Sequence, residues 1–194
     1  MKGICGALLA AVAAATTCVA DAAPSIEAVV AHPIFSTIYS CTEHALGELQ
    51  GLGDELGSDC HVERIVEQNG RKWLRAYRTD GLKNEDWFGW GADVLAPCTG
   101  KVDEIRENQV TNEPGIMGKP PASWIAVTCG EDLHFLLAHI AAPLVKVGDH
   151  LEAGQTIAQV GNNGMSRQPH IHIAAWRGKT ALQIRFDQAK IAIE

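Results

Sequence analysis

Short apolar runs separated by glycine turns dominate the chain from His61 onward and constrain its fold more than any other feature. Residues 62–66 and 72–77 flank Asn69-Gly70, a dipeptide that supplies the positive φ angles of a tight hairpin turn. Similar runs follow at 94–97, 101–105, 124–128, 133–139, 147–151, 153–158, 169–176 and 182–186. Many short strands with regularly spaced turns are typical of an all-β sandwich or barrel.

The segment before His61 has a different pattern. Its apolar residues are scattered among polar and glycine residues, and Pro33 interrupts them. We expect one or two short helices in residues 23–60, packed onto a β domain that spans residues 61–194. If residues 1–22 are a leader that is removed, roughly 170 residues remain, which suits one domain with one core.

The N-terminus has the features of a secretory signal peptide. Lys2 precedes an apolar run over residues 4–20, and Ala20-Asp21-Ala22 forms a small-x-small cleavage site. The run is too short and alanine-rich for a membrane span, and no later segment approaches the ~20 apolar residues that spanning needs. We therefore expect a secreted or periplasmic protein, cleaved near Ala22 and without a membrane span. A lipoprotein attached through Cys18 is the alternative, although the two preceding threonines do not resemble a lipobox.

Cleavage would leave four cysteines, Cys41, Cys60, Cys98 and Cys129. An even number in an oxidising compartment favours two disulfides with three possible connectivities, and pairing of sequence neighbours gives Cys41 with Cys60 and Cys98 with Cys129. A zinc site built from these cysteines is disfavoured, because none forms a C-x-x-C pair. The net charge of −7, without a cluster of lysine or arginine, argues against nucleic acid and anionic membranes as partners.

Two histidines stand two residues apart in the expected strand at 169–176. On a strand, His170 and His172 project from one face, while Ile171 and Ile173 enter the other. Two imidazoles on one face can hold a metal or divide the roles of ligand and base. A solvated strand edge would carry the same H-x-H pattern without any such role.

The residues around this pair resemble a known family. Residues 161–172, GNNGMSRQPHIH, closely resemble the G-N-x-G-x-S-x-x-P-H-L-H stretch of the lysostaphin-type, or LytM-like, zinc metallopeptidases. Residues 147–157 are similar to their V-x-x-G-D-x-V-x-x-G-Q-x-I segment, 138–140 to their Y-x-H-L strand and 91–97 to their G-x-x-V-x-A-P. The resemblance covers residues 71–176 in consistent order. It implies a mainly β, lysostaphin-type sandwich of the duplicated hybrid motif kind.

The resemblance also implies a zinc endopeptidase that cleaves peptide cross-links of bacterial peptidoglycan. Carried over by motif, His172 is a metal ligand, while His139 and His170 position or deprotonate the attacking water. A catalytic zinc needs three protein ligands and an open position. Its bound water then becomes acidic enough to attack an amide near neutral pH.

The chain departs from the family at the H-x-x-x-D motif, which should supply the other two ligands. No candidate aspartate has a histidine four residues before it. Position along the chain favours Asp86 as the ligand, because the family's ligand lies a short turn ahead of the G-x-x-V-x-A-P segment. Asp93 lies inside that segment. Asp80 comes somewhat too early in the chain but remains an alternative. His61 is a candidate for the third ligand. His134 has opposite parity to His139, which predicts a surface or packing role.

Two rival functions remain open. The chain could be a non-catalytic LytM-like module that binds the cell wall or activates a partner hydrolase. It could also be a biotinyl or lipoyl carrier, which shares the strand-and-turn pattern, but Lys101 directly follows the Gly100 turn and no lysine stands at a hairpin tip. Trp176 shares the parity of the histidine pair and is expected to pack in the core, with a cleft wall as the alternative.

Overall fold

The computed structural model describes residues 25–191, so the predicted signal peptide lies outside the described residues. These residues form β-strands and three short 3-10 helices, η1 (Asp54–Leu56), η2 (Asn84–Asp86) and η3 (Gln188–Lys190), and contain no α-helix. The strands are β1 (Ala28–Ala31), β2 (Tyr39–Glu43), β3 (Ser58–Val62), β4 (Arg64–Gln68), β5 (Arg71–Arg75), β6 (Asp93–Leu95), β7 (Gly100–Arg106), β8 (Trp124–Cys129), β9 (Leu133–Ala138), β10 (Ile140–Pro143), β11 (His150–Leu151), β12 (Thr156–Val160), β13 (Ile171–Arg177), β14 (Thr180–Ala181) and β15 (Gln183–Phe186). None of the described helices is long and apolar enough to cross a membrane.

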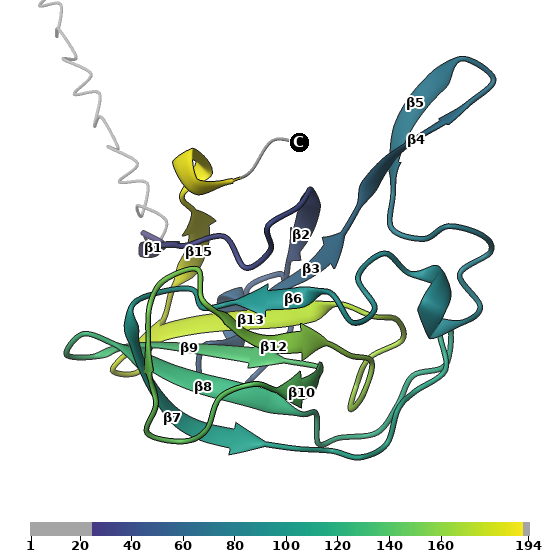
Figure 1. Cartoon of the computed structure of the whole chain (residues 1–194). Helices are drawn as coiled ribbons and strands as arrows, with labels where there is room; N and C mark the ends of the chain where they lie inside the picture. Colours follow the sequence, from purple (N-terminus) through teal and green to yellow (C-terminus); the bar gives the residue numbers. More distant parts are fainter. Residues whose placement is uncertain (1–24, 192–194) are drawn as a thin grey trace, which may run out of the picture.

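Two sheets pack face to face around the core. The large sheet has the order β11-β7-β8-β9-β13-β3-β2, with β14 paired to β13, and the small sheet has the order β10-β12-β6. Figure 1 shows the small sheet lying across β8, β9 and β13. Alternate residues of the large sheet, among them Ile125, Leu137 and Ile173, are fully buried against Val94 and Ile157 of the small sheet. The predicted mainly β sandwich is confirmed.

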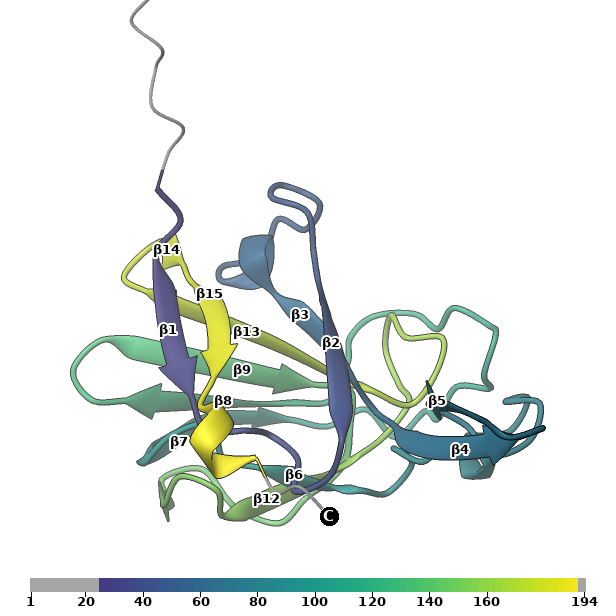
Figure 2. The ribbon, with the colours of Figure 1, turned by 90° about the horizontal axis from the view of Figure 1, so that it is seen from above.

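The one or two short helices predicted for residues 23–60 reduce, within the described residues 25–60, to the three-residue 3-10 helix η1, because much of the segment forms strands β1, β2 and β3. β1 pairs in parallel with β15, and the two lie side by side in Figure 2. β2 and β3 instead extend the large sheet, with Cys41 directly opposite Cys60. Long-range pairing thus supplies the backbone hydrogen bonds that a helix would have made locally. β3 also crosses the expected boundary at residue 60, so both segments share one sheet.

Both predicted disulfides are present, joining Cys41 to Cys60 and Cys98 to Cys129. The first links the two strands at the edge of the large sheet. The Asn69-Gly70 turn between β4 and β5 has φ angles of 54° and 72°, as its sequence predicts.

Candidate metal centre

The two histidines of the H-x-H motif project from the face of the large sheet opposite to the core. His172 in β13 is directly opposite Asp59 in β3, and residues that are directly opposite in an antiparallel pair share a face. His170 immediately precedes β13, and its Nε2 lies 3.5 Å from Asp59 Oδ1. Ile171 and Ile173 are fully buried in the core. The predicted alternation along this strand is therefore confirmed.

The loop that joins β2 to β3 brings further groups onto this face. His44 follows β2, and its Nε2 lies 3.4 Å from Asp59 Oδ1. Asp54 in η1 places its Oδ1 3.1 Å from His172 Nε2. Gly57 leaves room for the His172 ring, because a Cβ there would lie 2.8 Å from the ring carbon Cε1. The loop therefore holds one histidine and one carboxylate against the H-x-H strand.

Three of these side chains can bind one metal ion. The ligand atoms of His44, Asp59 and His172 all lie within 4.8 Å of one another. His172 Nδ1 is 2.9 Å from Asp59 Oδ1, whereas the buried His44 Nε2 has no hydrogen-bond partner within residues 25–191. A buried nitrogen without a partner is costly, and a metal ion would accept its lone pair. Two imidazoles and one carboxylate are ligands that zinc accepts, so the residues present fit zinc.

His139 reaches the same face through a break in its strand. Ala138, the last residue of β9, is opposite His172, so a regular strand would turn the next side chain toward the core. The φ of His139 is instead 67°, in the left-handed region, and its ring centroid lies 4.6 Å from that of His170. His139 Nδ1 donates to the Asn163 carbonyl over 2.7 Å. Because a carbonyl only accepts, the proton is on Nδ1 and the lone pair is on Nε2.

His170 is oriented by contacts at both ring nitrogens. Its Nδ1 lies 2.8 Å from the Gln168 carbonyl and 3.3 Å from Ser166 Oγ. Its Nε2 faces Asp59 Oδ1 over 3.5 Å. His139 therefore offers an unprotonated Nε2 beside the metal-binding group, and His170 presents its Nε2 to the carboxylate of that group.

Burial and nearby charges give the histidines different protonation states. Burial, reinforced by the charge of His170, lowers the pKa of His139 to about 3. Burial also lowers the pKa of His172, but the carboxylates of Asp54 and Asp59 outweigh it and raise that pKa to about 9. Burial likewise raises the pKa of Asp59, yet hydrogen bonds from His170 and His172 hold it well below its ordinary range. Without metal, His172 is thus an imidazolium between two carboxylates, and His139 is a neutral base.

The structure does not bring Asp86, the aspartate favoured by the sequence, to this group. Asp86 lies in η2, where its Oδ2 accepts a hydrogen bond from the Lys83 backbone N–H. Asp93 is an exposed residue of β6 in the small sheet, and Asp80 accepts from a backbone N–H in an exposed turn. Asp59, carried on a strand next to β13, stands opposite His172 in their place.

His61 lies beside the metal-binding group without joining it. Its ring stacks on His170, with centroids 5.1 Å apart and an interplanar angle of 15°. Its Nε2 lies 3.2 Å from Gln168 Nε2. Burial lowers the pKa of His61 to about 4, so the ring is neutral at pH 7. The group that can bind metal has His44 where the sequence suggested His61.

His134 and Trp176 pack against each other at the far end of the same strands. Their rings stack with centroids 5.3 Å apart, so His134 has the predicted packing role. Trp176 is half-buried on the face of His172, opposite to the core, so the expectation that it packs in the core is wrong. The register pairs Trp176 with His134, so His134 shares the face of His172. The parity argument that set His134 against His139 is wrong, because His139 leaves the strand with a positive φ.

The sequence interpretation missed His44, Asp54 and Asp59. They lie in the segment that was expected to be helical and have no H-x-x-x-D spacing. One signal was present in the sequence. Pairing Cys41 with Cys60 brings Asp59, which precedes Cys60, close to His44, which follows shortly after Cys41.

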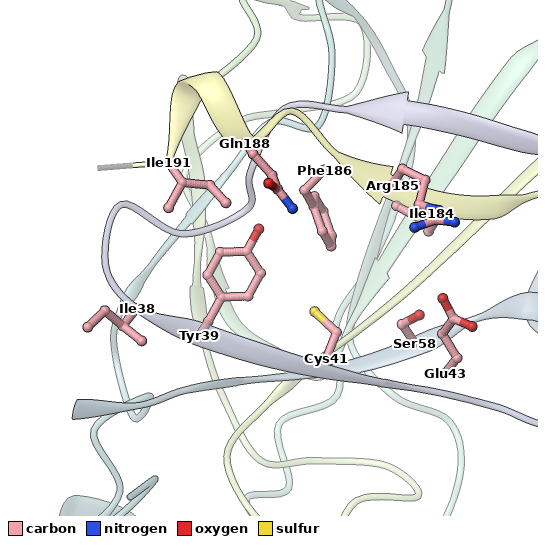
Figure 3. A pocket seen from close by; sticks show the side chains of 10 residues that line it. All are labelled: Ile38, Tyr39, Cys41, Glu43, Ser58, Ile184, Arg185, Phe186, Gln188 and Ile191. Carbon is pink, nitrogen blue, oxygen red and sulfur yellow. The ribbon is translucent and has the colours of Figure 1, made fainter. Parts of the chain in front are cut away.

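A separate pocket lies on the other face of β2 (Figure 3). Its volume is about 370 Å³, and β2, β3 and the C-terminal segment line it. The lining residues are Ile38, Tyr39, Cys41, Glu43, Ser58, Ile184, Arg185, Phe186, Gln188 and Ile191. Because Tyr39, Cys41 and Glu43 alternate with Ser40 and Thr42 along β2, the pocket and the metal-binding group occupy opposite faces of the sheet.

Residues 86–184 match the sequence profile of Peptidase family M23. The chain is also 30% identical over 82 residues to an uncharacterized metalloprotease of Haemophilus influenzae. That similarity covers 42% of this chain and only 15% of the relative's length.

Two solved structures are similar in overall arrangement. The catalytic domain of the antimicrobial peptidase lysostaphin from Staphylococcus simulans is 19% identical, with a TM-score of 0.45 over 72% of this chain and 80% of that one. The catalytic domain of the prophage-encoded M23 protein EnpA from Enterococcus faecalis is 19% identical, with a TM-score of 0.47 over 76% of this chain and 87% of that one.

Proposed function

This chain belongs to peptidase family M23, and we propose that it is an exported zinc endopeptidase that cleaves peptide cross-links of bacterial peptidoglycan. One observation carries the proposal: a set of three possible ligand atoms, from His44, Asp59 and His172, lies beside two further histidines, of which His139 presents an unprotonated Nε2. These residues would supply the metal ligands and the base that hydrolysis of an amide requires.

Each side chain has a distinct part in this mechanism. His44, Asp59 and His172 would hold the zinc ion, which when bound lowers the pKa of a water molecule and polarises the scissile carbonyl. His139 accepts a proton at Nε2, since burial keeps it neutral, and can return it to the leaving amine. His170 hydrogen-bonds through Nε2 to the attacking water. When Nε2 carries a proton, it donates to the developing oxyanion.

Asp54 would contact a metal ligand without binding the metal itself. Its carboxylate lies 3.1 Å from His172 Nε2, so Nδ1, the nitrogen nearest Asp59, would be the one to bind a metal ion. A carboxylate behind a ligating histidine fixes the ring orientation and makes the ligand nitrogen more basic. Asp54 is therefore a positioning residue.

Zinc content and sacculus digestion test the proposal together. The purified exported chain should contain one equivalent of zinc and should release cleaved cross-links from peptidoglycan sacculi. His170→Ala should retain zinc but lose hydrolysis, whereas His172→Ala should lose both. His150→Ala, a substitution at an exposed histidine of β11, serves as the control. Zinc-loaded protein that leaves the muropeptides unchanged would contradict the proposed peptidase activity.

A non-catalytic wall-binding or hydrolase-activating module is the second candidate. The family match begins at residue 86, so two of the three ligand candidates, His44 and Asp59, lie outside the matched residues. If these residues do not bind a metal ion, the chain has the family's fold without a metal site for hydrolysis. Absence of zinc from the wild-type protein, combined with binding to sacculi, would favour this candidate.

A further inference from the structure

The hairpin formed by β4 and β5 projects from the body of the molecule (Figures 1 and 2). Its two strands pair only with each other and belong to neither main sheet. Isolated two-stranded hairpins are marginally stable and add little to a core. Residues 64–75 also precede the family match at 86–184. The hairpin is thus an addition that neither the core nor the proposed catalytic centre explains.

The strand register gathers arginines on one face of this hairpin. Arg64 is directly opposite Arg75, and Arg71 lies on the same face at the turn end, opposite Gln68. Val66 and Trp73 stand between them, with the Trp73 side chain 37% exposed. In the sequence these arginines are too widely spaced to form a cluster. Only the pairing of β4 with β5 brings them together on what we term the arginine face.

The arginine face has no counterions of its own. The acidic residue of the hairpin, Glu67, pairs with Lys72 at 3.8 Å on the other face. Within residues 25–191, no ion pair involves Arg64, Arg71 or Arg75. Like charges placed directly opposite each other destabilise a strand pair. This local excess of positive charge stands on a chain whose net charge is −7, and it would attract an anionic partner.

Aromatic rings hold two of these guanidinium groups in place. The Arg64 guanidinium lies 5.1 Å from the centroid of Phe88, and that of Arg75 lies 4.6 Å from the centroid of Tyr77. Cation–π contacts of this kind orient the group without neutralising its charge. Ordered arginines lose less conformational entropy when they bind carboxylates in a bidentate manner.

The hairpin continues directly from the strand that carries the metal-binding aspartate. β3 holds Asp59 and His61, and β4 begins at Arg64, two residues after β3 ends. A polymer bound at the catalytic face can therefore extend onto the arginine face. Building on the proposed function, we propose that the arginine face binds carboxylates of peptidoglycan away from the scissile bond, while Trp73 offers a flat apolar surface to its sugar rings.

Binding to intact sacculi tests this assignment without any cleavage. All variants carry His170→Ala, so the polymer stays whole. Arg71→Ser/Arg75→Ser should weaken co-sedimentation with sacculi by about tenfold at physiological salt. Lys72→Ser/Lys179→Ser removes the same charge from the other face of the hairpin and from the turn after β13, and should change binding less than twofold, by the same reasoning. Circular dichroism and melting temperature should show that both double variants fold.

Two further measurements decide which chemistry is recognised. Converting the sacculus carboxylates to neutral amides should reduce binding by the His170→Ala protein to the level of the arginine variant. Binding that survives this conversion, or equal binding by the two double variants, would overturn the proposal. So would arginine-dependent binding to anionic phospholipid vesicles that exceeds binding to sacculi. Because no arm depends on hydrolysis, a failure here is distinct from a failure of the peptidase assignment.

Discussion

The Nε2 of His44 lies 3.4 Å from Oδ1 of Asp59, although residues 45–58 separate them along the chain. This approach results from the pairing of β2 with β3, which the Cys41–Cys60 disulfide closes. In the proposed zinc site this pair would take the place of the contiguous H-x-x-x-D motif that the resemblance led us to expect. His44 thus becomes the residue that most directly tests the metal site.

Replacing His44 by alanine should lower zinc affinity by at least about 100-fold, because the loss of a ligand should cost no less than the loss of a supporting residue. Competition with a chromogenic chelator measures the change. His150→Ala should leave the affinity unchanged, since His150 is exposed on β11. If His44→Ala binds zinc as tightly as the wild type, the third ligand is a different residue.

Asp54→Asn removes the carboxylate behind His172 while retaining the size of the side chain. We expect zinc affinity to fall by roughly 10- to 100-fold, because the ring loses the negative charge that orients it and makes its ligand nitrogen more basic. Glu55→Gln, the same chemical change at the exposed neighbouring residue, is the matched control. Equal affinities for the two variants would show that Asp54 does not position His172.

The stability of the metal-free chain should depend on pH with a maximum near 6.5. Burial lowers the pKa of His139 to about 3 and that of His61 to about 4, so stability declines as the pH falls below 6.5. The pKa of His172 is raised to about 9, so its contribution is complete below 6.5 and is lost as the pH rises through 9.

Melting temperatures measured with a chelator present check this dependence. His139→Asn should flatten the acid side of the profile, and His172→Asn the alkaline side. Variants with the same pH profile as the wild type would mean that these histidines do not titrate as inferred. Saturating zinc should stabilise the alkaline side, since binding requires a deprotonated His172 nitrogen.

The two disulfides should affect the metal site differently. Replacing both cysteines of either pair by alanine should cost about 2–4 kcal/mol of unfolding free energy. Only the Cys41–Cys60 variant should also bind zinc more weakly, because that bond ties the edge strand leading to His44 to the strand of Asp59. Zinc titration well below the melting temperature separates the two effects. Equal affinity in both variants would contradict this role.

Much of the fold could be predicted because its signals are local. Alternating apolar residues identified the strands, and Asn69-Gly70 identified the hairpin turn. The H-x-H spacing alone placed His170 and His172 on one face, since side chains alternate along any strand. Sequence neighbourhood was also enough to pair the cysteines. The helices expected at 23–60 failed because scattered apolar residues do not reveal that a distant strand supplies the hydrogen bonds.

Only the tertiary structure decided which residues stand beside the histidine pair. His172 meets Asp59, 113 residues away in the sequence, because β13 and β3 align in one particular register. No local pattern encodes that register, and a shift of one residue would turn Asp59 to the opposite face. The positive φ of His139 and the arginine face of the hairpin likewise depend on the backbone path and on strand pairing. The sequence by itself determined most of the strands after residue 61 and the chemistry of one motif, while the packing of distant strands determined the site.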